Sequence, residues 1–293
     1  MAMYRAKQEG RNRFEFFDVS LDHLRRSGFE RRKRLAEAAE KGELRLHYQP
    51  VINLRSGRIE SFEALLRWQD PEIGTLVLPM DFLPAIMDTG LIVGIGSWVL
   101  EQAINQVSSW QGMGLDLNVS VNVALRQLGD PDFPERLKSL FGDHPGVAPH
   151  KVELEILETS AISDMHQIQQ TLTACRDLGV RLSLDDFGTG YSSLSYLKNL
   201  PIDLLKIDQS FVSGMLENRG NIAVIRSIVS MSRIFGREVV AEGMESALQG
   251  RMLLSMGCNL AQGYAIAEPM PGERIPEWVE GWSRNPDWME HLH

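Results

Sequence analysis

The sequence predicts an α/β protein that folds as a modified TIM-type (β/α)8 barrel with its first strand antiparallel to the second. Strand-like and helix-like segments alternate from residue 43 to residue 264, which favours a barrel or an open parallel sheet. Only residues 53–57 separate the first two strand-like segments, and so short a loop cannot make a parallel crossover. Polar residues gather at the strand ends, where barrels of this type carry their chemistry.

The strands are expected where polar and apolar residues alternate, or where a short apolar run lies between turn residues. In chain order they are residues 43–51, 58–66, 116–123, 152–157, 180–185, 204–208, 238–242 and 260–264. The helices are expected at residues 79–88, 95–111, 133–140, 164–178, 194–199, 221–235 and 246–254. An open doubly wound sheet is the second architecture considered, but it usually has Gly-x-Gly-x-x-Gly after its first strand, and none is present.

Composition restricts the class of protein. A chain of 293 residues, 43% hydrophobic and 24% charged, fits a soluble globular protein of one large domain or two modest ones. The net charge of −9 argues against nucleic acid polymers and anionic membranes as partners. No apolar run is long enough to span a bilayer, and no signal peptide opens the chain. The two cysteines form no Cys-x-x-Cys, which favours a reducing cytoplasm, and the 7 histidines lack zinc-ligand spacing.

The strand at 180–185 ends in Asp185 and Asp186, and Gly188 and Gly190 follow before a helix. A strand ending in acids, then a glycine loop and a helix, suits an anion, a metal ion or both. A Walker-type loop is excluded because no Gly-Lys-Ser/Thr follows, and a kinase Asp-Phe-Gly because no His-Arg-Asp loop exists. Asp186 has the opposite strand parity to Asp185, so we expect the chain to be turning there already, with the two glycines making the turn.

Polar side chains at the other strand ends fall on the face that would point into the barrel, while aliphatic residues take the outer face. They are Glu63, Arg67, Asn122, Glu155, Lys206, Asp208, Glu242 and Gln262, and Glu158 lies just beyond the strand of Glu155. Buried like charges are very costly, so either several carboxylates are protonated or cations hold them together. Oxygen ligands suit Mg²⁺ or Mn²⁺ rather than Zn²⁺, and more than three carboxylates leave room for two ions roughly 3.5–4 Å apart.

The ordered motifs of residues 43–280 resemble those of the EAL domain, a cyclic di-GMP phosphodiesterase family. The signature stands in Phe62-Glu63-Ala64-Leu65-Leu66-Arg67-Trp68. The other matching motifs are Tyr48-Gln49-Pro50, Ser120-Val121-Asn122, Glu155-Ile156-Leu157-Glu158, the segment 185–194, Lys206-Ile207-Asp208, Val240-Ala241-Glu242-Gly243 and Gln262-Gly263-Tyr264. A lone Glu-Ala-Leu carries no weight, but this series on expected strand ends is specific.

The resemblance implies hydrolysis of one phosphodiester bond of cyclic di-GMP to give linear pGpG, with two Mg²⁺ or Mn²⁺ ions activating a water for in-line attack on phosphorus. It also implies a homodimer formed through this domain. The implied metal ligands are Glu63, Asn122, Glu155 and Asp185 for one ion, and Asp185 and Asp186 for the second. The implied catalytic residues are Glu242, Lys206 and Glu63, with Gln262 and Glu158 in support. The implied substrate-binding residues are Arg67, Gln49 and Asp208.

Some positions depart from the family pattern, and two rival functions stay open. Met87 stands where the family usually has Glu, and Glu268 stands where a basic residue is more usual. Neither is an expected metal ligand. One rival is a cyclic di-GMP receptor without catalysis, and the other is an unrelated metal-dependent barrel such as an enolase-like lyase.

Residues 1–18 resemble the C-terminal remnant of a GGDEF (diguanylate cyclase) domain, through Ala2-Met3-Tyr4-Arg5-Ala6-Lys7 and Gly10-Arg11-Asn12. This implies a longer tandem protein, in the cytoplasm, which missing upstream domains could tether to a membrane. Residues 19–42 are charged and helical in pattern, and without interleaved aromatic residues they favour a solvated linker helix over a nucleic-acid or lipid patch. The expected domains are therefore 1–18, 19–42, the barrel 43–280 and a C-terminal tail 281–293.

Overall fold

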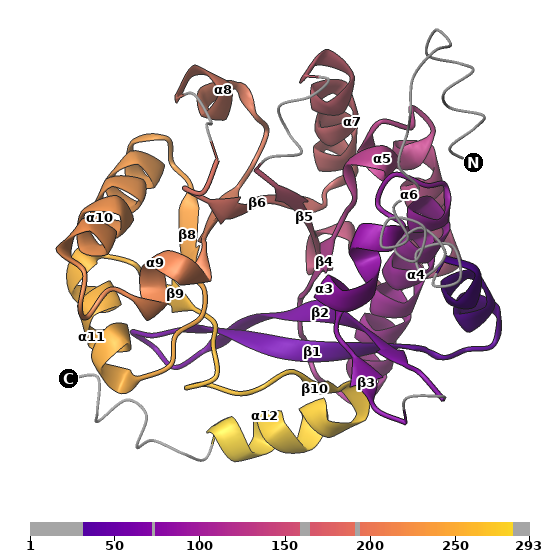
Figure 1. Ribbon diagram of the computed structural model, residues 1–293, viewed down its shortest axis with the longest axis horizontal. Helices are drawn as coiled ribbons and strands as arrows, with labels where there is room; N and C mark the ends of the chain where they lie inside the picture. Colours follow the sequence, from indigo (N-terminus) through magenta and orange to yellow (C-terminus); the bar gives the residue numbers. More distant parts are fainter. Residues whose placement is uncertain (1–31, 72–73, 159–164, 191–193, 284–293) are drawn as a thin grey trace, which may run out of the picture.

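The strands close into a barrel, as the sequence predicts. The computed structural model describes residues 32–71, 74–158, 165–190 and 194–283 (Figure 1). Within these residues the strands form one 10-stranded sheet in the order β10-β1-β9-β8-β7-β6-β5-β4-β2-β3, and an additional β1–β2 pairing closes it. Eight of the strands make the barrel, and β3 and β10 extend its edges. The strands are β1 (Leu44–Asn53), β2 (Ile59–Gln69), β3 (Leu76–Val77), β4 (Val119–Asn122), β5 (Val152–Leu157), β6 (Arg181–Phe187), β7 (Leu204–Ile207), β8 (Glu238–Ala241), β9 (Leu260–Ala261) and β10 (Met270–Pro271).

Strand β1 runs against both of its barrel neighbours. It pairs antiparallel with β2 from Leu44↔Trp68 to Ile52↔Ile59, and antiparallel with β9 at Ile52↔Ala261. The remaining barrel pairings, from β2–β4 through β8–β9, are parallel. The short turn after β1 decides this direction, because Gly57 adopts a left-handed φ of 70° and its N–H donates to Asn53 O at 2.8 Å.

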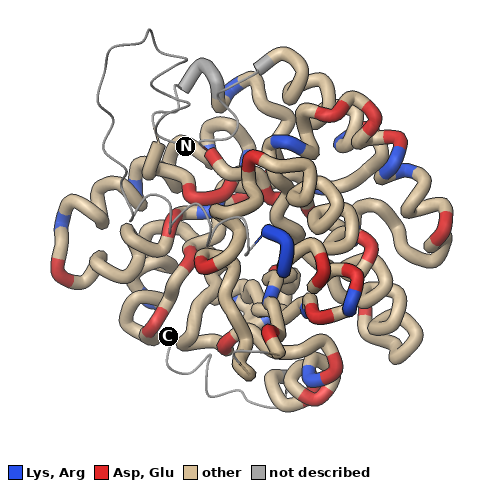
Figure 2. The backbone as a smooth tube through the Cα atoms, turned by 45° about the vertical axis from the view of Figure 1, so that its right-hand side comes forward, with Lys and Arg blue, Asp and Glu red and all other residues tan. Residues whose placement is uncertain are grey.

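Helices surround the parallel part of the barrel (Figure 1). They are α3 (Pro79–Phe82), α4 (Leu91–Gly112), α5 (Leu125–Leu128), α6 (Phe133–Asp143), α7 (Met165–Leu178), α8 (Leu194–Asn199), α9 (Gln209–Ser213), α10 (Arg219–Ile234), α11 (Ala247–Met256) and α12 (Ile275–Ser283), with short 3₁₀ turns η1 (Leu83–Ala85), η2 (Pro149–Lys151) and η4 (Gly272–Arg274). Lys and Arg are interspersed with Asp and Glu along the surface elements (Figure 2).

The main core lies between the strands and these helices. Outward-facing strand residues such as Val119, Val121, Leu182 and Leu184 are fully buried there. Their neighbours along each strand face the barrel interior, because side chains alternate between the two faces of a strand. The interior therefore receives the polar residues of the strand ends.

The predicted elements correspond closely to the observed ones. Strand β5 has the predicted bounds, and most other predicted strands differ from the observed ones by one to three residues at each end. Five short or terminal elements, β3, β10, α5, α9 and α12, were not predicted from the sequence. Strands β3 and β10 have two residues each, and their pairing with β2 and β1 depends on tertiary contacts.

The predictions for the two ends of the chain fall mostly outside the described residues. This holds for the GGDEF-like segment 1–18, most of the linker 19–42, and most of the tail 281–293. Residues 32–40 are helical, and Leu35 and Ala38 of that helix are fully buried in the main core. The Arg34 guanidinium contacts Asp70 Oδ1 at 2.5 Å and lies 5.2 Å from the Trp68 ring centroid, which ties this helix to the end of β2.

Helix α12 packs against the β1–β2 hairpin. The Trp278 ring meets the Phe62 ring edge-on at a centroid distance of 5.9 Å, and Trp282 Nε1 donates to Gly57 O at 2.8 Å. In Figure 1 α12 lies below β1 and β10. None of the helices in the described part of the chain has the length and apolar character needed to cross a membrane.

Candidate active site

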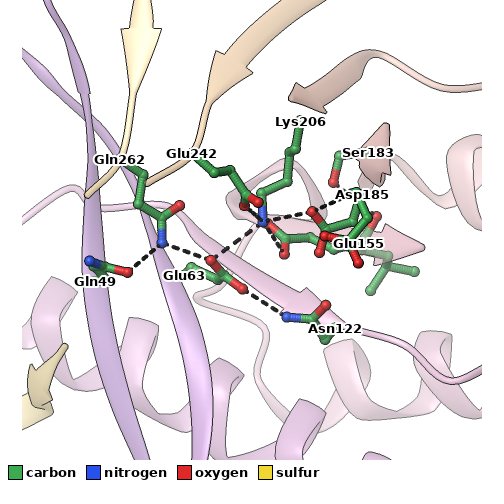
Figure 3. Close-up of polar contacts among 11 residues, drawn as sticks. Gln49, Glu63, Asn122, Glu155, Ser183, Asp185, Lys206, Glu242 and Gln262 are labelled. Carbon is green, nitrogen blue, oxygen red and sulfur yellow. Dashed lines mark hydrogen bonds and ion pairs between the residues drawn. The ribbon is translucent and has the colours of Figure 1, made fainter. Parts of the chain in front are cut away.

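Eight polar side chains meet inside the barrel at the carboxyl ends of the parallel strands (Figure 3). Six of them lie in barrel strands, and two directly follow the strands β8 and β9. In the sequence they are spread over the whole barrel, from Gln49 to Gln262. The network contains Gln49, Glu63, Asn122, Glu155, Asp185, Lys206, Glu242 and Gln262. All eight were predicted as site residues, and the fold brings them together.

Lys206 lies at the centre of this network. Its ammonium group is 2.7 Å from Glu242 Oε1 and 2.8 Å from Glu155 Oε2. It is also 3.4 Å from both Glu63 Oε2 and Asp185 Oδ1. The side chain is 2% exposed, so these contacts are little screened by water. One cation therefore holds four carboxylates in the barrel interior.

This arrangement shifts the pKa of Lys206 and of its partners. Burial alone would lower the pKa of Lys206, but the carboxylates of Asp185, Glu155, Glu242 and Glu63 raise it well above its usual value. Burial, together with the charge of Glu63, raises the pKa of Glu155 well above its usual range despite Lys206. Lys206 therefore stays protonated, and its positive charge does not suffice for every carboxylate around it.

Glu242 and the Asp185–Asp186 pair also hold protons more tightly than exposed acids do. Burial raises the pKa of Glu242 to about 8, with Lys206 opposing the shift and Asp185 and Glu63 adding to it. Burial and the neighbouring Asp185 carboxylate raise the pKa of Asp186 to about 6. Burial likewise raises the pKa of Asp185, against the effect of Lys206. Such shifts are typical of functional carboxyl groups.

Two amides hold the Glu63 carboxylate. Asn122 Nδ2 donates to Glu63 Oε1 at 2.8 Å, and Gln262 Nε2 donates to Glu63 Oε2 at 2.7 Å. Burial would raise the pKa of Glu63, but Lys206 and these donors bring it below its usual value. Glu63 therefore favours the ionised form more than Glu155, Asp185 and Glu242 do, because their pKa values are raised.

A pairing irregularity in β6 places Asp185 and Asp186 side by side. The β6–β7 register shifts between Leu184 and Phe187, so the two acidic residues lie within a bulge. Asp186 has a φ of 55°, in the left-handed region that Asp tolerates better than most residues. The chain therefore turns at Asp186, as the strand parity predicts.

The two glycines after this turn have different roles. Gly188 has a φ of 103° and continues the turn. A Cβ on Gly190 would lie 2.7 Å from Glu158 Oε1, so glycine is needed there because of a close approach. Glu158 Oε2 accepts from Gly188 N at 2.9 Å and from Gly190 N at 3.3 Å. Both glycines thus belong to the turn, Gly188 through its left-handed φ and Gly190 through its close approach to Glu158.

Arg67 and Asp208 lie beside the network. Arg67 is 8% exposed, and its Nη1 donates to Leu66 O at 2.8 Å. Burial lowers the pKa of Arg67, while Tyr264 and Glu63 raise it. Asp208 Oδ1 accepts from Ser210 N at 3.1 Å and so caps α9. The charge of its carboxylate adds to the effects of burial and of Asp185, which raise the pKa of Asp186.

The residues present fit divalent cations. Asp185, Asp186 and Glu242 each offer an oxygen, and these oxygens lie within 4.8 Å of one another. Gln262 Oε1 is buried and accepts no hydrogen bond from the described part of the chain. A buried unpaired acceptor beside raised-pKa carboxylates fits a site that takes a cation or a water molecule.

Two polar features of the barrel were not singled out from the sequence. Glu153, two residues before Glu155 on β5, is buried, and its Oε2 lies 3.7 Å from Arg181 Nε. Arg181 also pairs with Glu238. Burial raises the pKa of Glu153. The sequence could have indicated this, because Glu153 has the same strand parity as Glu155 and so faces the barrel interior. The second feature is a pair of hydrogen bonds through Gln49, which no sequence pattern indicates.

Most of the chain is similar to known proteins. A family model described as EAL domain matches residues 32–269. The chain is 38% identical over 275 residues to the bifunctional diguanylate cyclase/cyclic di-GMP phosphodiesterase MucR of Pseudomonas aeruginosa, covering 94% of this chain and 40% of MucR. It is 37% identical over 280 residues to the cyclic di-GMP phosphodiesterase PdeR of Escherichia coli, covering 95% of this chain and 42% of PdeR.

A solved structure, the PaMucR phosphodiesterase in complex with c-di-GMP, superposes with a TM-score of 0.80 at 38% identity. The match covers 84% of this chain and 99% of that one. The chain thus spans less than half the length of the curated relatives that it matches, but nearly all of this related domain.

Proposed function

The chain belongs to the EAL domain family, and from this we propose that it is a metal-dependent phosphodiesterase that hydrolyses cyclic di-GMP to linear pGpG. The observation that carries this proposal is the convergence of four carboxylates on buried Lys206. Such a site is costly for folding, because each buried charge must be compensated. Its cost is explained by a function that uses the carboxylates.

The donor set suits Mg²⁺ or Mn²⁺, because it consists of carboxylate and amide oxygens. We assign one ion to Glu63, Asn122, Glu155 and Asp185, and a second to Asp185 and Asp186, with Glu242 close enough to join the second. When bound, such ions would supply Lewis-acid stabilisation of negative charge on the phosphoryl oxygens.

Charge balance supports two ions. The five carboxylates and one ammonium group leave four negative charges when all are ionised, and two divalent ions would neutralise them. The carboxylates are those of Glu63, Glu155, Asp185, Asp186 and Glu242, and the ammonium group is that of Lys206. The bound ions would also allow an acidic protein to hold a dianionic substrate.

The reaction replaces one phosphorus–oxygen bond by another. A water oxygen gives up one proton and attacks phosphorus in line, the bond from phosphorus to the ribose oxygen breaks, and that oxygen takes up one proton, from protonated Glu242 or from solvent, to leave as a hydroxyl group. We assign the water proton to Glu242, because burial gives its carboxylate a higher affinity for a proton than an ordinary carboxylate has. Lys206, 2.7 Å from Glu242 Oε1, orients this carboxylate and balances its charge.

Other residues serve the substrate and the loop. Arg67 presents a guanidinium whose fork matches phosphate oxygens, and Asp208 lies at the same end of the barrel beside Asp186. Glu158 holds the backbone at Gly188 and Gly190. We also expect a homodimer formed through this domain, which light scattering at several protein concentrations would test.

Turnover with separated nucleotides tests the function. The chain is incubated with cyclic di-GMP and either Mg²⁺ or Mn²⁺, and the products are resolved chromatographically. We expect pGpG in the presence of ions and none with EDTA. Tight cyclic di-GMP binding with no pGpG in either metal would replace the enzyme by a receptor. Absence of both binding and turnover would leave an unrelated metal-dependent barrel.

Substitutions of Glu63 and Asp185 test the assigned ion ligands. Glu63→Ala and Asp185→Ala should each abolish pGpG formation, because both carboxylates contact Lys206 and belong to the assigned ion ligands. Circular dichroism should show that the fold is kept. Activity near that of the unchanged protein in either variant would show that these ligands are wrongly assigned.

A further inference from the structure

A chain of amide hydrogen bonds runs from a backbone carbonyl into the candidate site. Gln49 Nε2 donates to Ala267 O at 2.9 Å. Gln262 Nε2 then donates to Gln49 Oε1 at 2.9 Å and to Glu63 Oε2 at 2.7 Å. Gln49 and Gln262 are 7% and 4% exposed, so water does not compete for these groups. Figure 3 shows the side chains of Gln49, Gln262 and Glu63 in this order.

The direction of these bonds is fixed at both ends. A backbone carbonyl only accepts, so Ala267 O requires the NH₂ group of Gln49 and turns Gln49 Oε1 toward Gln262. At the other end, the Glu63 carboxylate accepts from the amide NH₂ groups of Asn122 and Gln262 and has no donor to offer. Both constraints require the NH₂ group of Gln262 on the same side. Rotating the Gln262 amide by 180° would set its oxygen against two acceptors.

The starting point of this chain is rigid. Residues Gly263–Ala267 form a compact turn, in which Ile266 N donates to Gly263 O and Ala265 N donates to Met244 O. A Cβ on Gly263 would lie 2.2 Å from Met244 backbone atoms, and its φ of 156° lies at the edge of the region favouring glycine. Just beyond, Met270 pairs with Tyr48 in β1. The Ala267 carbonyl is therefore held by backbone on both sides.

The consequence is a buried acceptor of fixed orientation. With both Nε2 hydrogens engaged, Gln262 Oε1 accepts no hydrogen bond from the described residues. In Figure 3 this oxygen lies on the side of Glu242 and Lys206. A group that meets it inside the site must donate a proton or carry positive charge, which is what an attacking water does with its hydrogens.

We propose that Gln49 is a positioning residue, which holds the Gln262 amide so that Gln262 Oε1 faces the site as an acceptor for water. This rests on the proposed phosphodiesterase function. It differs from the substrate contact that the family resemblance implies for Gln49, because both polar atoms of Gln49 are engaged within the protein. The two roles predict different kinetics.

The first test is Gln49→Met, which keeps the length of the side chain and removes both hydrogen bonds. Loss of a partner of this kind typically lowers activity about 10–100-fold. We expect this fall in kcat for pGpG formation, with KM for cyclic di-GMP changed less than about twofold. A raised KM with unchanged kcat would overturn the proposal in favour of substrate contact.

Gln169→Met is the matched control, since Gln169 Nε2 also donates to a backbone carbonyl, Asn199 O at 3.0 Å, at an exposed site. It should leave kcat and KM unchanged. If both variants lose kcat equally, Gln49 has no special role. Rates are measured well below the melting temperature of each variant and per folded molecule.

A second measurement does not depend on turnover. In the ion-free protein we expect the two Gln262 side-chain NH₂ protons to exchange slowly with solvent in NMR spectra, and to exchange faster in Gln49→Met. Fast exchange of these protons in the unchanged protein would overturn the proposal even if pGpG forms. Slow exchange without any pGpG would instead refute the phosphodiesterase function and leave the orientation of Gln262 established.

Discussion

The ammonium group of Lys206 faces four carboxylates in the barrel interior, and its removal leaves their charges without compensation. We expect Lys206→Met to lower the free energy of unfolding of the ion-free protein by about 3–5 kcal/mol, as for other broken buried ion pairs. Urea unfolding measures this change. The loss should be smaller at pH 5 than at pH 8, because protonated carboxyl groups repel one another less.

Lys138→Met provides the control. Lys138 is 61% exposed and pairs with exposed Glu135, so its loss should change the free energy of unfolding by less than about 1 kcal/mol. Equal losses in the two variants would show that Lys206 does not compensate buried carboxylate charges.

The protons held by Glu242 and Asp186 make cation binding depend on pH. The pKa of Glu242 is about 8, against an ordinary 4.5 in the unfolded chain, so between these values the folded state binds more protons. The ion-free protein therefore loses stability as pH rises through this window. A divalent ion must displace these protons, so it binds more tightly as pH rises.

Thermal unfolding with and without MnCl₂ measures this dependence. At a free ion concentration of 100 Kd, the ion adds about 2.7 kcal/mol to the free energy of unfolding. We expect a larger rise in Tm at pH 8.5 than at pH 6, reversed by EDTA. An equal rise at both pH values would contradict the assignment of Glu242 and Asp186 as groups close to the ion.

At this scale the sequence predicted which side chains meet, because strand parity puts Lys206 inside and Ile207 outside. It could not predict the orientation of Gln49. That orientation depends on the carbonyl of Ala267, which is 218 residues away and contacts Gln49 only when the barrel has closed.

Among the elements, β6 and the turn after it depend on Glu158. Gly190→Ala would place a Cβ 2.7 Å from Glu158 Oε1 and displace the carboxylate that accepts from Gly188 N and Gly190 N. Because hydrogen bonds to a charged carboxylate contribute about 1.5–3 kcal/mol and these two are only partly buried, we expect a loss of stability of about 1–3 kcal/mol. Faster hydrogen exchange at Gly188 should accompany it.

Gly142→Ala is the corresponding control. Gly142 lies in α6, and no atom stands within 4 Å of the position that its Cβ would take. Alanine should there leave stability unchanged or raise it by about 0.4–1 kcal/mol. A loss of stability in Gly142→Ala like that in Gly190→Ala would remove the close contact as the explanation.

The elements that the sequence predicted best are buried on both faces. Strand β5 reads as a continuous run from Val152 to Leu157, and its bounds agree with the prediction. Strand β10 could not be predicted, because Met270 and Pro271 become a strand only by pairing with β1. The turn at Asp186 was predicted from the opposite strand parity of the two adjacent acids, but the bulge in the β6–β7 pairing was not.

For the whole molecule, the alternation of strands and helices does not distinguish a closed barrel from an open sheet. Closure depends on β1, which joins β2 on one side and meets β9 through Ile52↔Ala261 on the other. The short loop predicted the first pairing. The β1–β9 pairing links segments about 200 residues apart in the chain, so no local sequence pattern predicts it.

Helix α12 stabilises this closing hairpin although it lies beyond the family match, which ends at residue 269. Ile275 is fully buried, and the Trp278 ring packs against Phe62 of β2 at 5.9 Å. We expect Trp278→Ala to lower the free energy of unfolding by about 2–3 kcal/mol, less than for a fully buried Trp because Trp278 is half-buried. Urea unfolding measures the change.

Leu248→Ala serves as the control, since Leu248 on α11 is 48% exposed and should cost less than about 0.5 kcal/mol. The effect of Trp278→Ala should extend to the β1–β2 turn. Trp282 stacks on Trp278 at 5.2 Å and donates to Gly57 O in the β1–β2 turn, so Trp278→Ala should speed hydrogen exchange in that turn. Unchanged exchange there, with stability lost elsewhere, would mean that α12 does not support the hairpin that closes the barrel.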